Sequence, residues 1–303
     1  MVLDGGLSTA LAERGADLDH PLWTARSLLD PTPDARHPIT EAHLAFLRAG
    51  ARVLITASYQ ASRRGLMAAG AATAADADEA LARSTALGRA AVGRFADESA
   101  DAGSVRVGAS VGPYGAVLAD GSEYHGRYAI GADELRTFHR ERLAVLLASR
   151  PDLLIAETLP AAFEAAALAG ALGGLDGGGV PVWVSFTCAD GHRTVHGDRI
   201  EDAAGAALAV PGVAAIGVNC TAPALVGELL ERIATVTDLP LVAYPNRGQQ
   251  WDATTNVWTE TPAAWPPTSV ATWTAAGARW VGGCCGVGPD GIRALRAVLV
   301  PDP

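Results

Sequence analysis

The sequence contains no lysine, so all 23 of its basic residues are arginine. Without a lysine amine, a protein cannot form a Schiff base with a carbonyl substrate, bind pyridoxal phosphate covalently or build the lysine of a phosphate-binding loop. Many barrel enzymes and nucleotide-dependent enzymes are therefore excluded.

Cysteine is also scarce. Four cysteines in 303 residues are too few for a disulfide scaffold in a chain of this length. Residues 1–6 have no basic region followed by an apolar stretch, so they do not resemble a secretory signal peptide. We therefore expect a cytoplasmic protein whose thiols stay reduced.

Positive charge is in deficit, because 33 acidic residues give a net charge of −10. Such a chain has no excess of cations to neutralise phosphates, which argues against nucleic acids and anionic membranes as partners. One uncharged stretch, residues 203–227, is long enough to span a bilayer, but Pro211, Gly212, Asn219 and Pro223 interrupt it. It predicts a helix end, a turn, a strand and a further turn. We expect small-molecule substrates, and no feature implies a protein partner.

Hydrophobic residues make up 49% of the chain, enough for a large core. Eight short apolar runs recur, and most are nearly continuous in Val, Ile, Leu and Ala, as is typical of strands buried on both faces. These runs are residues 2–3, 52–57, 105–111, 152–156, 181–187, 213–218, 239–244 and 278–281. Segments with helical periodicity lie between them, at residues 40–49, 76–95, 133–148, 161–172, 223–236 and 289–299.

This alternation predicts an α/β fold, a single (β/α)8 TIM barrel that forms one domain over residues 1–303. An open doubly wound sheet is the alternative, but the count of eight and the lack of a domain boundary favour the barrel. The active site of such a barrel lies at the C-terminal ends of its strands. The residues that follow each apolar run are therefore the candidates for function.

Three of the four cysteines follow the sixth and eighth runs: Cys220, Cys284 and Cys285. If their thiolates converge over the barrel mouth, they form a soft site with one open position, which suits a catalytic Zn²⁺. Alternatively, the adjacent pair forms a strained vicinal disulfide or is incidental. Cys188 is interpreted as a small buried hydrophobe.

Two carboxylates, Asp4 and Glu157, stand at other strand ends. Each alone is more typical of a helix cap or an ion pair. Together they could hold a substrate ammonium group, and Gly5 and Gly6 would leave backbone amides open to a carboxylate. Such a site suits an amino acid zwitterion.

Trp23, in the long first loop, is a candidate of a different kind, together with Tyr59 after the second run. Their ring faces could attract a cationic ligand. A tryptophan in such a loop is equally often a lid over the core.

Two other motifs do not support the chemistry that they suggest. Residues 286–291 match G-x-G-x-x-G, but a dinucleotide site needs a further strand and an acidic residue about 20 positions on, and the chain ends at Pro303. We expect a tight turn there, with Pro289 opening the last helix. Asp190 and His192 begin a cobalamin-like motif whose required glycine is Val195, so this segment predicts only a polar loop.

At these positions the sequence resembles the homocysteine S-methyltransferase family. The resemblance covers nearly the whole chain, and its most specific part is the single cysteine followed by the cysteine pair. It is carried by residues 4–6, 22–25, 55–60, 108–115, 119–124, 157–160, 219–220, 244–246 and 282–285.

The resemblance implies a (β/α)8 barrel that uses zinc to methylate homocysteine to methionine. It implies that Cys220, Cys284 and Cys285 bind Zn²⁺. It also implies that Asp4 and Glu157 hold the homocysteine ammonium group. The homocysteine carboxylate would bind the amides near Gly5, together with Ser58. Independently of the resemblance, the ring faces of Trp23 and Tyr59 make these residues our candidates to face a cationic methyl donor.

The motifs point to the branch of the family that uses S-methylmethionine or S-adenosylmethionine. Betaine-dependent and cobalamin-dependent members carry further segments, whereas 18 residues follow Cys285 here. Two departures stand out. Only three residues precede Asp4, which predicts a short first strand or a truncated start. After the cysteine pair, residues 286–289 are Gly-Val-Gly-Pro, where relatives often carry a basic residue and Thr.

The implied reaction needs no general acid, because a sulfonium donor leaves as a neutral thioether. This agrees with strand ends that offer no catalytic histidine or lysine. Alternatives remain open: another donor, a different thiol or selenol acceptor, a barrel that uses the cysteine pair for redox chemistry, and a non-catalytic zinc-binding or thiol-binding module.

Overall fold

The structure is a computed structural model that describes residues 1–248, 250–252, 257–259 and 264–300. Its centre is a sheet of seven parallel strands, each hydrogen bonded to the next in the order that follows. These strands are β1 (Val53–Ile55), β2 (Arg106–Val111), β3 (Leu153–Leu159), β4 (Val182–Phe186), β5 (Val213–Asn219), β6 (Leu241–Tyr244) and β9 (Ala278–Val281).

The N-terminal residues close this sheet into a barrel. Val2 pairs in parallel with Val281 of β9, and Leu3 pairs in parallel with Val53 of β1. The predicted (β/α)8 TIM barrel is therefore confirmed. Its first strand is short, with these two bridging residues in the place of a longer ladder.

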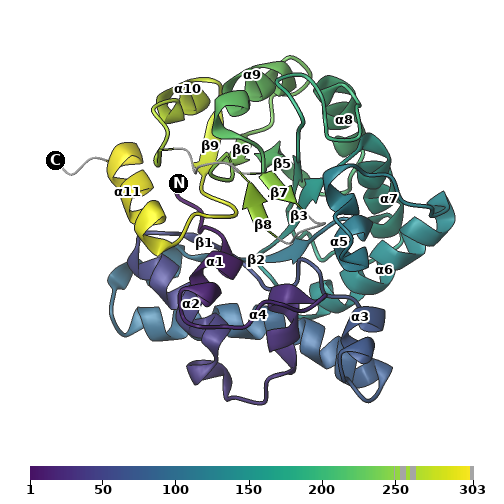
Figure 1. The fold of residues 1–303 in the computed structure, drawn as a ribbon, viewed down its shortest axis with the longest axis vertical. Coiled ribbons are helices and arrows are strands. Elements are labelled where there is room, and N and C mark those ends of the chain that lie inside the picture. The colour runs from purple at the N-terminus through teal and green to yellow at the C-terminus, as the bar shows by residue number, and fades with distance from the viewer. Residues whose placement is uncertain (249, 253–256, 260–263, 301–303) are drawn as a thin grey trace.

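Helices surround the barrel, as Figure 1 shows. They are α1 (Leu7–Ala12), α2 (Pro38–Arg48), α3 (Arg63–Ala68), α4 (Ala74–Ala96), α5 (Tyr114–Leu118), α6 (Ala132–Ala148), α7 (Ala162–Leu172), α8 (Ile200–Ala207), α9 (Pro223–Ala234), α10 (Val270–Ala275) and α11 (Pro289–Leu299). The six predicted helices are confirmed to within two residues at each end. The capping box of Thr73 and Asp76 explains where α4 begins, and prolines in the first turn open α9 and α11.

Five shorter helices, α1, α3, α5, α8 and α10, are not among the helical segments expected from the sequence. Each has eight residues or fewer, which is about two turns and too short for a clear 3.6-residue period. The uncharged stretch at 203–227 forms the end of α8, a turn, β5 and the start of α9, as expected. In the described part of the chain, no helix is long and apolar enough to cross a membrane.

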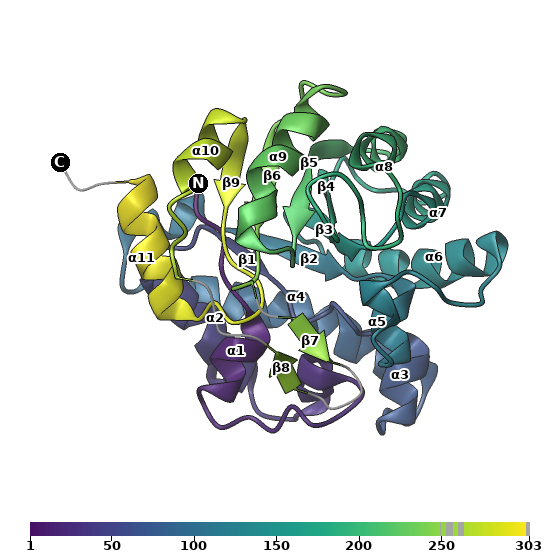
Figure 2. The same cartoon turned by 45° about the horizontal axis from the view of Figure 1, so that its top comes forward.

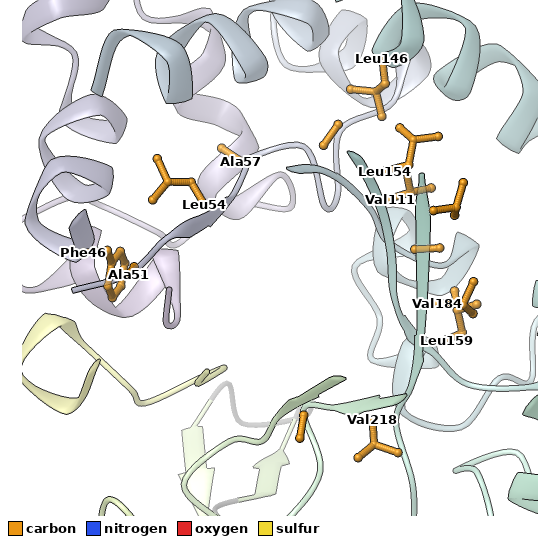
Figure 3. Close-up of a cluster of buried hydrophobic side chains, with 14 of the residues drawn as sticks. Phe46, Ala51, Leu54, Ala57, Val111, Leu146, Leu154, Leu159, Val184 and Val218 are labelled. Carbon is orange, nitrogen blue, oxygen red and sulfur yellow. The ribbon is translucent and has the colours of Figure 1, made fainter. Parts of the chain in front are cut away.

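Two separate cores follow from the alternation of side chains along the strands. Leu54, Leu154, Val184 and Val218 point outward and pack against the helices, where Figure 3 shows them with Leu146 of α6. The intervening side chains fill the barrel interior. This inner core contains Leu3, Val53, Leu153, Ile155, Trp183, Ala215, Val242 and Tyr244.

One element is absent from the sequence predictions. A short antiparallel hairpin, β7 (Gln250–Asp252) and β8 (Val257–Thr259), separates β6 from α10. In Figure 1 it projects within the ring of strands, and in Figure 2 it lies below the strands, on the same side as α1.

Candidate active site

Three cysteine sulfurs meet at the C-terminal end of the barrel. The Sγ of Cys220, after β5, lies 3.8 Å from the Sγ of Cys285, and the Sγ atoms of Cys284 and Cys285 are 4.0 Å apart. All three lie within 4.8 Å of one another, and all four cysteines of the chain are free thiols. The predicted convergence is confirmed, and the alternative of a vicinal disulfide is wrong in this structure.

These residues fit a zinc ion. Four-coordinate Zn²⁺ with Zn–S bonds near 2.3 Å places its sulfur ligands about 3.8 Å apart. The sulfurs already stand near that spacing, and thiolate is the ligand type that zinc favours. Hydrogen bonds from Cys220 and Cys284 hold the pKa of Cys285 well below its usual value, whereas the pKa values of Cys220 and Cys284 are raised well above theirs, so without a metal the trio favours a single thiolate at Cys285.

Cys220 is held in an unusual backbone conformation, with φ of 50°. Its amide donates to the Tyr244 carbonyl at 3.2 Å, and its own carbonyl accepts from Asn246 Nδ2 at 3.2 Å and Thr187 Oγ1 at 3.3 Å. Non-glycine residues in the left-handed region cost about 1–3 kcal/mol and concentrate at functional sites. The surrounding bonds supply the constraint that keeps Cys220 there.

The cysteine pair lies in a tight turn at the end of β9. Val287 donates its amide to the Cys284 carbonyl at 3.1 Å, and Gly286 has φ of 79°, which favours glycine. A Cβ on Gly6 would stand 2.7 Å from the Cys284 carbonyl oxygen, so the first loop approaches this turn closely. The glycines at 286 and 288 therefore make a turn and the start of α11, as expected, rather than a dinucleotide site.

A cavity of about 100 Å³, which we name the inner cavity, opens beside the sulfurs. Among the described residues, no arginine or histidine lines it. Its lining includes the three cysteines, Gly5, Trp23, Tyr59, Tyr124, Glu157, Thr158 and Tyr244.

Glu157 enters this cavity from β3. It lies one alternate position beyond Ile155 of the inner core, so strand geometry turns its side chain into the barrel. The Ser110 hydroxyl donates to its Oε1. Burial is the largest cause that raises the Glu157 pKa, to about 8. A bound cation would offset that cost and favour the carboxylate.

Asp4 lies in the barrel wall next to the inner cavity rather than in its lining. Its Oδ2 accepts from the Ile55 amide at 2.8 Å, and its backbone carbonyl accepts from the Gly283 amide at 3.1 Å. Its Oδ1 is buried without a hydrogen-bond partner among the described atoms. Burial raises the Asp4 pKa well above its usual range, and the Glu157 charge adds to the shift.

The other predicted substrate-binding groups have different surroundings. Gly5 lines the inner cavity, but the Gly6 amide donates to the Val287 carbonyl at 2.9 Å and is not available to a substrate. Ser58 is fully buried, and its hydroxyl donates to the Ser110 carbonyl at 2.7 Å. Ser58 therefore contributes to the wall between β1 and β2.

Trp23 and Tyr59, the predicted donor-binding residues, both line the inner cavity. Burial, followed by the charge of Glu123, raises the Tyr59 pKa well above its usual value, so the phenol stays neutral. Arg142 of α6 fixes the loop that carries this ring, because its guanidinium donates to the Tyr59 carbonyl at 2.8 Å and to the Gly112 carbonyl at 2.9 Å.

The family model for homocysteine S-methyltransferases matches residues 1–299 of this chain. The chain belongs to the homocysteine S-methyltransferase family. A maize relative named homocysteine S-methyltransferase 4 is 42% identical over 98% of this chain and 89% of its own length. The Escherichia coli homocysteine S-methyltransferase is 39% identical over 98% of this chain and 94% of its own length. A selenocysteine methyltransferase from Astragalus bisulcatus is 38% identical over 98% of this chain and 92% of its own length.

Solved structures of an E. coli family member, the homocysteine methyltransferase MmuM, have the same fold. The metallated form matches with a TM-score of 0.85 at 38% identity, over 98% of this chain and 96% of that one. The apo form matches with a TM-score of 0.75 over 98% of this chain and 95% of that one. The oxidised form matches with a TM-score of 0.85 at 38% identity, the same values as the metallated form.

Some structural features of this family member were not expected from sequence reasoning. Asn219 links the ends of β3 and β5 and directly precedes Cys220, and Tyr124 lines the inner cavity from a loop after α5. Both lie in motifs that carry the family resemblance, but strand patterning alone offered no signal for their roles. Cys188 is buried in the outer core, apart from the other three cysteines, as expected.

Proposed function

We propose that this enzyme transfers a methyl group from a sulfonium donor, S-methylmethionine or S-adenosylmethionine, to the sulfur of L-homocysteine, which gives methionine. The observation that carries the proposal is the convergence of the three cysteine sulfurs beside a cavity with an acidic group and aromatic walls. Membership of the family and the names of the relatives support the same reaction.

Cys220, Cys284 and Cys285 are the residues that would hold Zn²⁺. A zinc ion with an open position lowers the pKa of a thiol that it binds and so makes it a nucleophile at neutral pH. A free thiol has a pKa near 8.5 and is mostly protonated under those conditions. The remaining task of the protein is to bind and orient the two substrates.

Glu157 would accept the homocysteine ammonium group, with Asp4 in the adjacent wall as a second acidic group. We assign the homocysteine carboxylate to the amide of Gly5 and keep Ser58, which supports that region of the wall, as a weaker candidate. Trp23 and Tyr59 would face the sulfonium with their rings.

The transfer itself balances without an acid catalyst. The bond between the donor sulfur and its methyl carbon breaks as a bond from the homocysteine sulfur to that carbon forms. The donor sulfur keeps the electron pair and leaves as a neutral thioether, while the homocysteine thiol proton goes to solvent. This agrees with the lack of arginine and histidine in the described lining of the inner cavity.

We further propose that residues 1–303 act as one barrel domain in the cytoplasm. The site draws on both ends of the chain, since Gly5 and Cys285 line the same cavity, so neither end can be removed without loss of the site. The four free thiols are consistent with a reducing compartment.

A methyl-transfer assay tests the proposal. The purified protein is given homocysteine with S-methylmethionine, S-adenosylmethionine or betaine, and zinc is measured on protein purified without added metal. We expect turnover with at least one sulfonium donor, none with betaine, and about one zinc per chain. Absence of turnover with every donor, on zinc-loaded protein, would exclude the proposed function.

Selenocysteine is a second candidate acceptor, because relatives 38% identical to the chain are named selenocysteine methyltransferases. The groups proposed to bind homocysteine in the inner cavity would bind any amino acid with a thiol or selenol in the same way. A competition assay between homocysteine and selenocysteine separates the two by their kcat/KM ratio.

A further inference from the structure

A second cavity adjoins the inner cavity on its open side. We name it the outer cavity, and its volume is about 570 Å³. Trp23 and Tyr124 line both cavities, so the two spaces adjoin at these residues. The outer cavity is also lined by Gln60, Glu123, His20 and the exposed Asp19, and no arginine lines it among the described residues.

Glu123 is the unusual group in this lining. Its side chain is 7% exposed, yet its Oε2 has no hydrogen-bond partner among the described atoms. Gln60, 5% exposed, likewise has an unpartnered Oε1. The Glu123 carboxyl group accepts from its own backbone amide, but its second oxygen is buried without a partner, which is costly, and a cation that supplies N–H donors removes that cost.

The loop that carries Glu123 is firmly built. Asp120 Oδ1 accepts from the Ser122 amide at 2.9 Å, and the Gly126 amide donates to the Ser122 carbonyl at 2.7 Å. A Cβ on Gly115 would lie 2.5 Å from the Glu123 amide nitrogen, so α5 packs directly against this turn. The carboxyl group is therefore held at the cavity rather than free to turn into solvent.

We propose that Glu123, assisted by Gln60, binds the α-ammonium group of the methyl donor. This inference rests on the proposed function. An amino acid donor carries two positive charges, and three carbons separate its sulfonium from its ammonium nitrogen. With the sulfonium against Trp23 and Tyr59 and its methyl group toward the cysteines, the ammonium end enters the outer cavity past Tyr124.

The assignment gives each substrate its own carboxylate. Glu157 lies in the inner cavity for homocysteine, and Glu123 lies in the outer cavity for the donor. It also explains selectivity, because a donor without an N–H group, such as betaine, leaves Glu123 buried and unpaired. S-methylmethionine and S-adenosylmethionine share the recognised group and are tested separately.

The test is the variant Glu123→Gln, which keeps the shape and removes the charge. In the wild type, turnover with each donor first establishes the proposed function. We then expect the KM for the sulfonium amino acid to rise at least 10-fold in the variant, while the KM for homocysteine and the zinc content stay within 2-fold. Glu231→Gln, which removes the same charge from an exposed position on α9, controls for net charge.

A second arm uses dimethylsulfoniopropionate, a sulfonium that lacks the amino group, as a competitor of the donor. Its inhibition constant should be the same in the wild type and in Glu123→Gln. If that constant rises as much as the donor KM, Glu123 acts on the sulfonium or on the loop, and the proposal is overturned. An unchanged donor KM in a folded, zinc-loaded variant overturns it as well.

Discussion

Asn219 and Thr158 form a reciprocal pair of hydrogen bonds across the mouth of the barrel. The Thr158 amide donates to Asn219 Oδ1, and Asn219 Nδ2 donates to Thr158 Oγ1, each at 2.7 Å. Thr158, with φ of 58°, directly follows Glu157, and Asn219 directly precedes Cys220. One amide side chain therefore sets the position of the acidic group relative to the cysteine cluster.

Replacing this amide tests that role. Asn219→Ala removes the Oδ1 atom that accepts from two buried donors, the Thr158 amide and the Ser185 hydroxyl. We expect unfolding to become easier by about 1–3 kcal/mol, the cost of leaving the Thr158 amide unpaired, because Ser185 keeps its hydrogen bond with the Tyr244 hydroxyl. Zinc affinity and kcat/KM should fall together. Thr158→Val removes a hydroxyl that bonds Asn219 and Tyr59 but keeps the amide bond to Asn219, so it should have a smaller effect in a urea titration. Normal zinc affinity in folded Asn219→Ala would contradict the role.

The cysteine cluster is tested by three single substitutions. Serine at position 220, 284 or 285 should abolish stoichiometric zinc and methyl transfer, because a hydroxyl is a poor zinc ligand. The control, Cys188→Ser, changes a cysteine outside the cluster and should retain both. Elemental analysis and the methyl-transfer assay report the two properties. Full activity of metal-free Cys284→Ser protein would refute a role for the metal.

Glu157→Gln keeps the acceptor for the Ser110 hydroxyl and removes the charge. We expect homocysteine use to weaken by about 1.5–3 kcal/mol, the usual size for a charge-assisted hydrogen bond. Zinc should stay bound. A simple thiol without an amino group serves as the control acceptor, and its rate should not change. Equal losses for both acceptors would show that Glu157 does not recognise the ammonium group.

Trp23→Leu keeps bulk at the inner cavity and removes the aromatic face. A cation over such a face gains about 0.5–2 kcal/mol, so the KM for the sulfonium donor should rise by roughly 2- to 30-fold. The KM for homocysteine and the zinc content should not change, and Trp23→Phe should recover part of the loss. Steady-state kinetics with each substrate varied in turn measures the split. A change confined to the KM for homocysteine would assign the Trp23 ring to the homocysteine site instead of the donor site.

The outer cavity predicts a pH dependence of donor binding. Burial raises the pKa of Glu123 to about 7, and Asp120 on the same turn adds to the shift. The neutral Tyr59 and Tyr124 and, across the cavity, Asp19 and His20 are the other titratable groups near it. Below about pH 7 the carboxyl group is protonated and attracts an ammonium group weakly, so the donor KM should fall as pH rises through 7.

In Glu123→Gln the fall of the donor KM with rising pH should disappear, because an amide does not titrate.

The raised pKa of Glu123 also affects the stability of the free protein. Its folded state holds the Glu123 proton between about pH 4.5 and 7, where the unfolded state releases it, so this group lowers stability as pH rises through that window. Urea titrations across the window should show less of that decline in the variant. A donor KM with the same pH profile in both proteins would contradict the assignment.

Much of the architecture could be predicted from the sequence, because strand and helix patterns are local. The run at 152–156 is apolar from Leu153 onward and Glu157 follows it, so the position of that carboxylate at the end of a strand was predictable, whereas its direction into the barrel was not. The spacing of Cys220 from the Cys284–Cys285 pair was informative because tips of barrel strands meet at one end. The short helices and the β7–β8 hairpin were missed because their local patterns are too brief.

What the sequence by itself determined was the barrel, the end of it that carries the site, and the three cysteines. Only the tertiary structure decided that the Asp4 carboxylate accepts from the Ile55 amide of β1. It also decided that the Ser58 hydroxyl donates to the Ser110 carbonyl of β2, and that the Gly6 amide donates to the Val287 carbonyl. It alone placed Glu123 without a partner beside the rings of Trp23 and Tyr124. Periodicity shows which face of an element is buried, whereas a hydrogen-bond partner far along the chain is set by how the barrel closes.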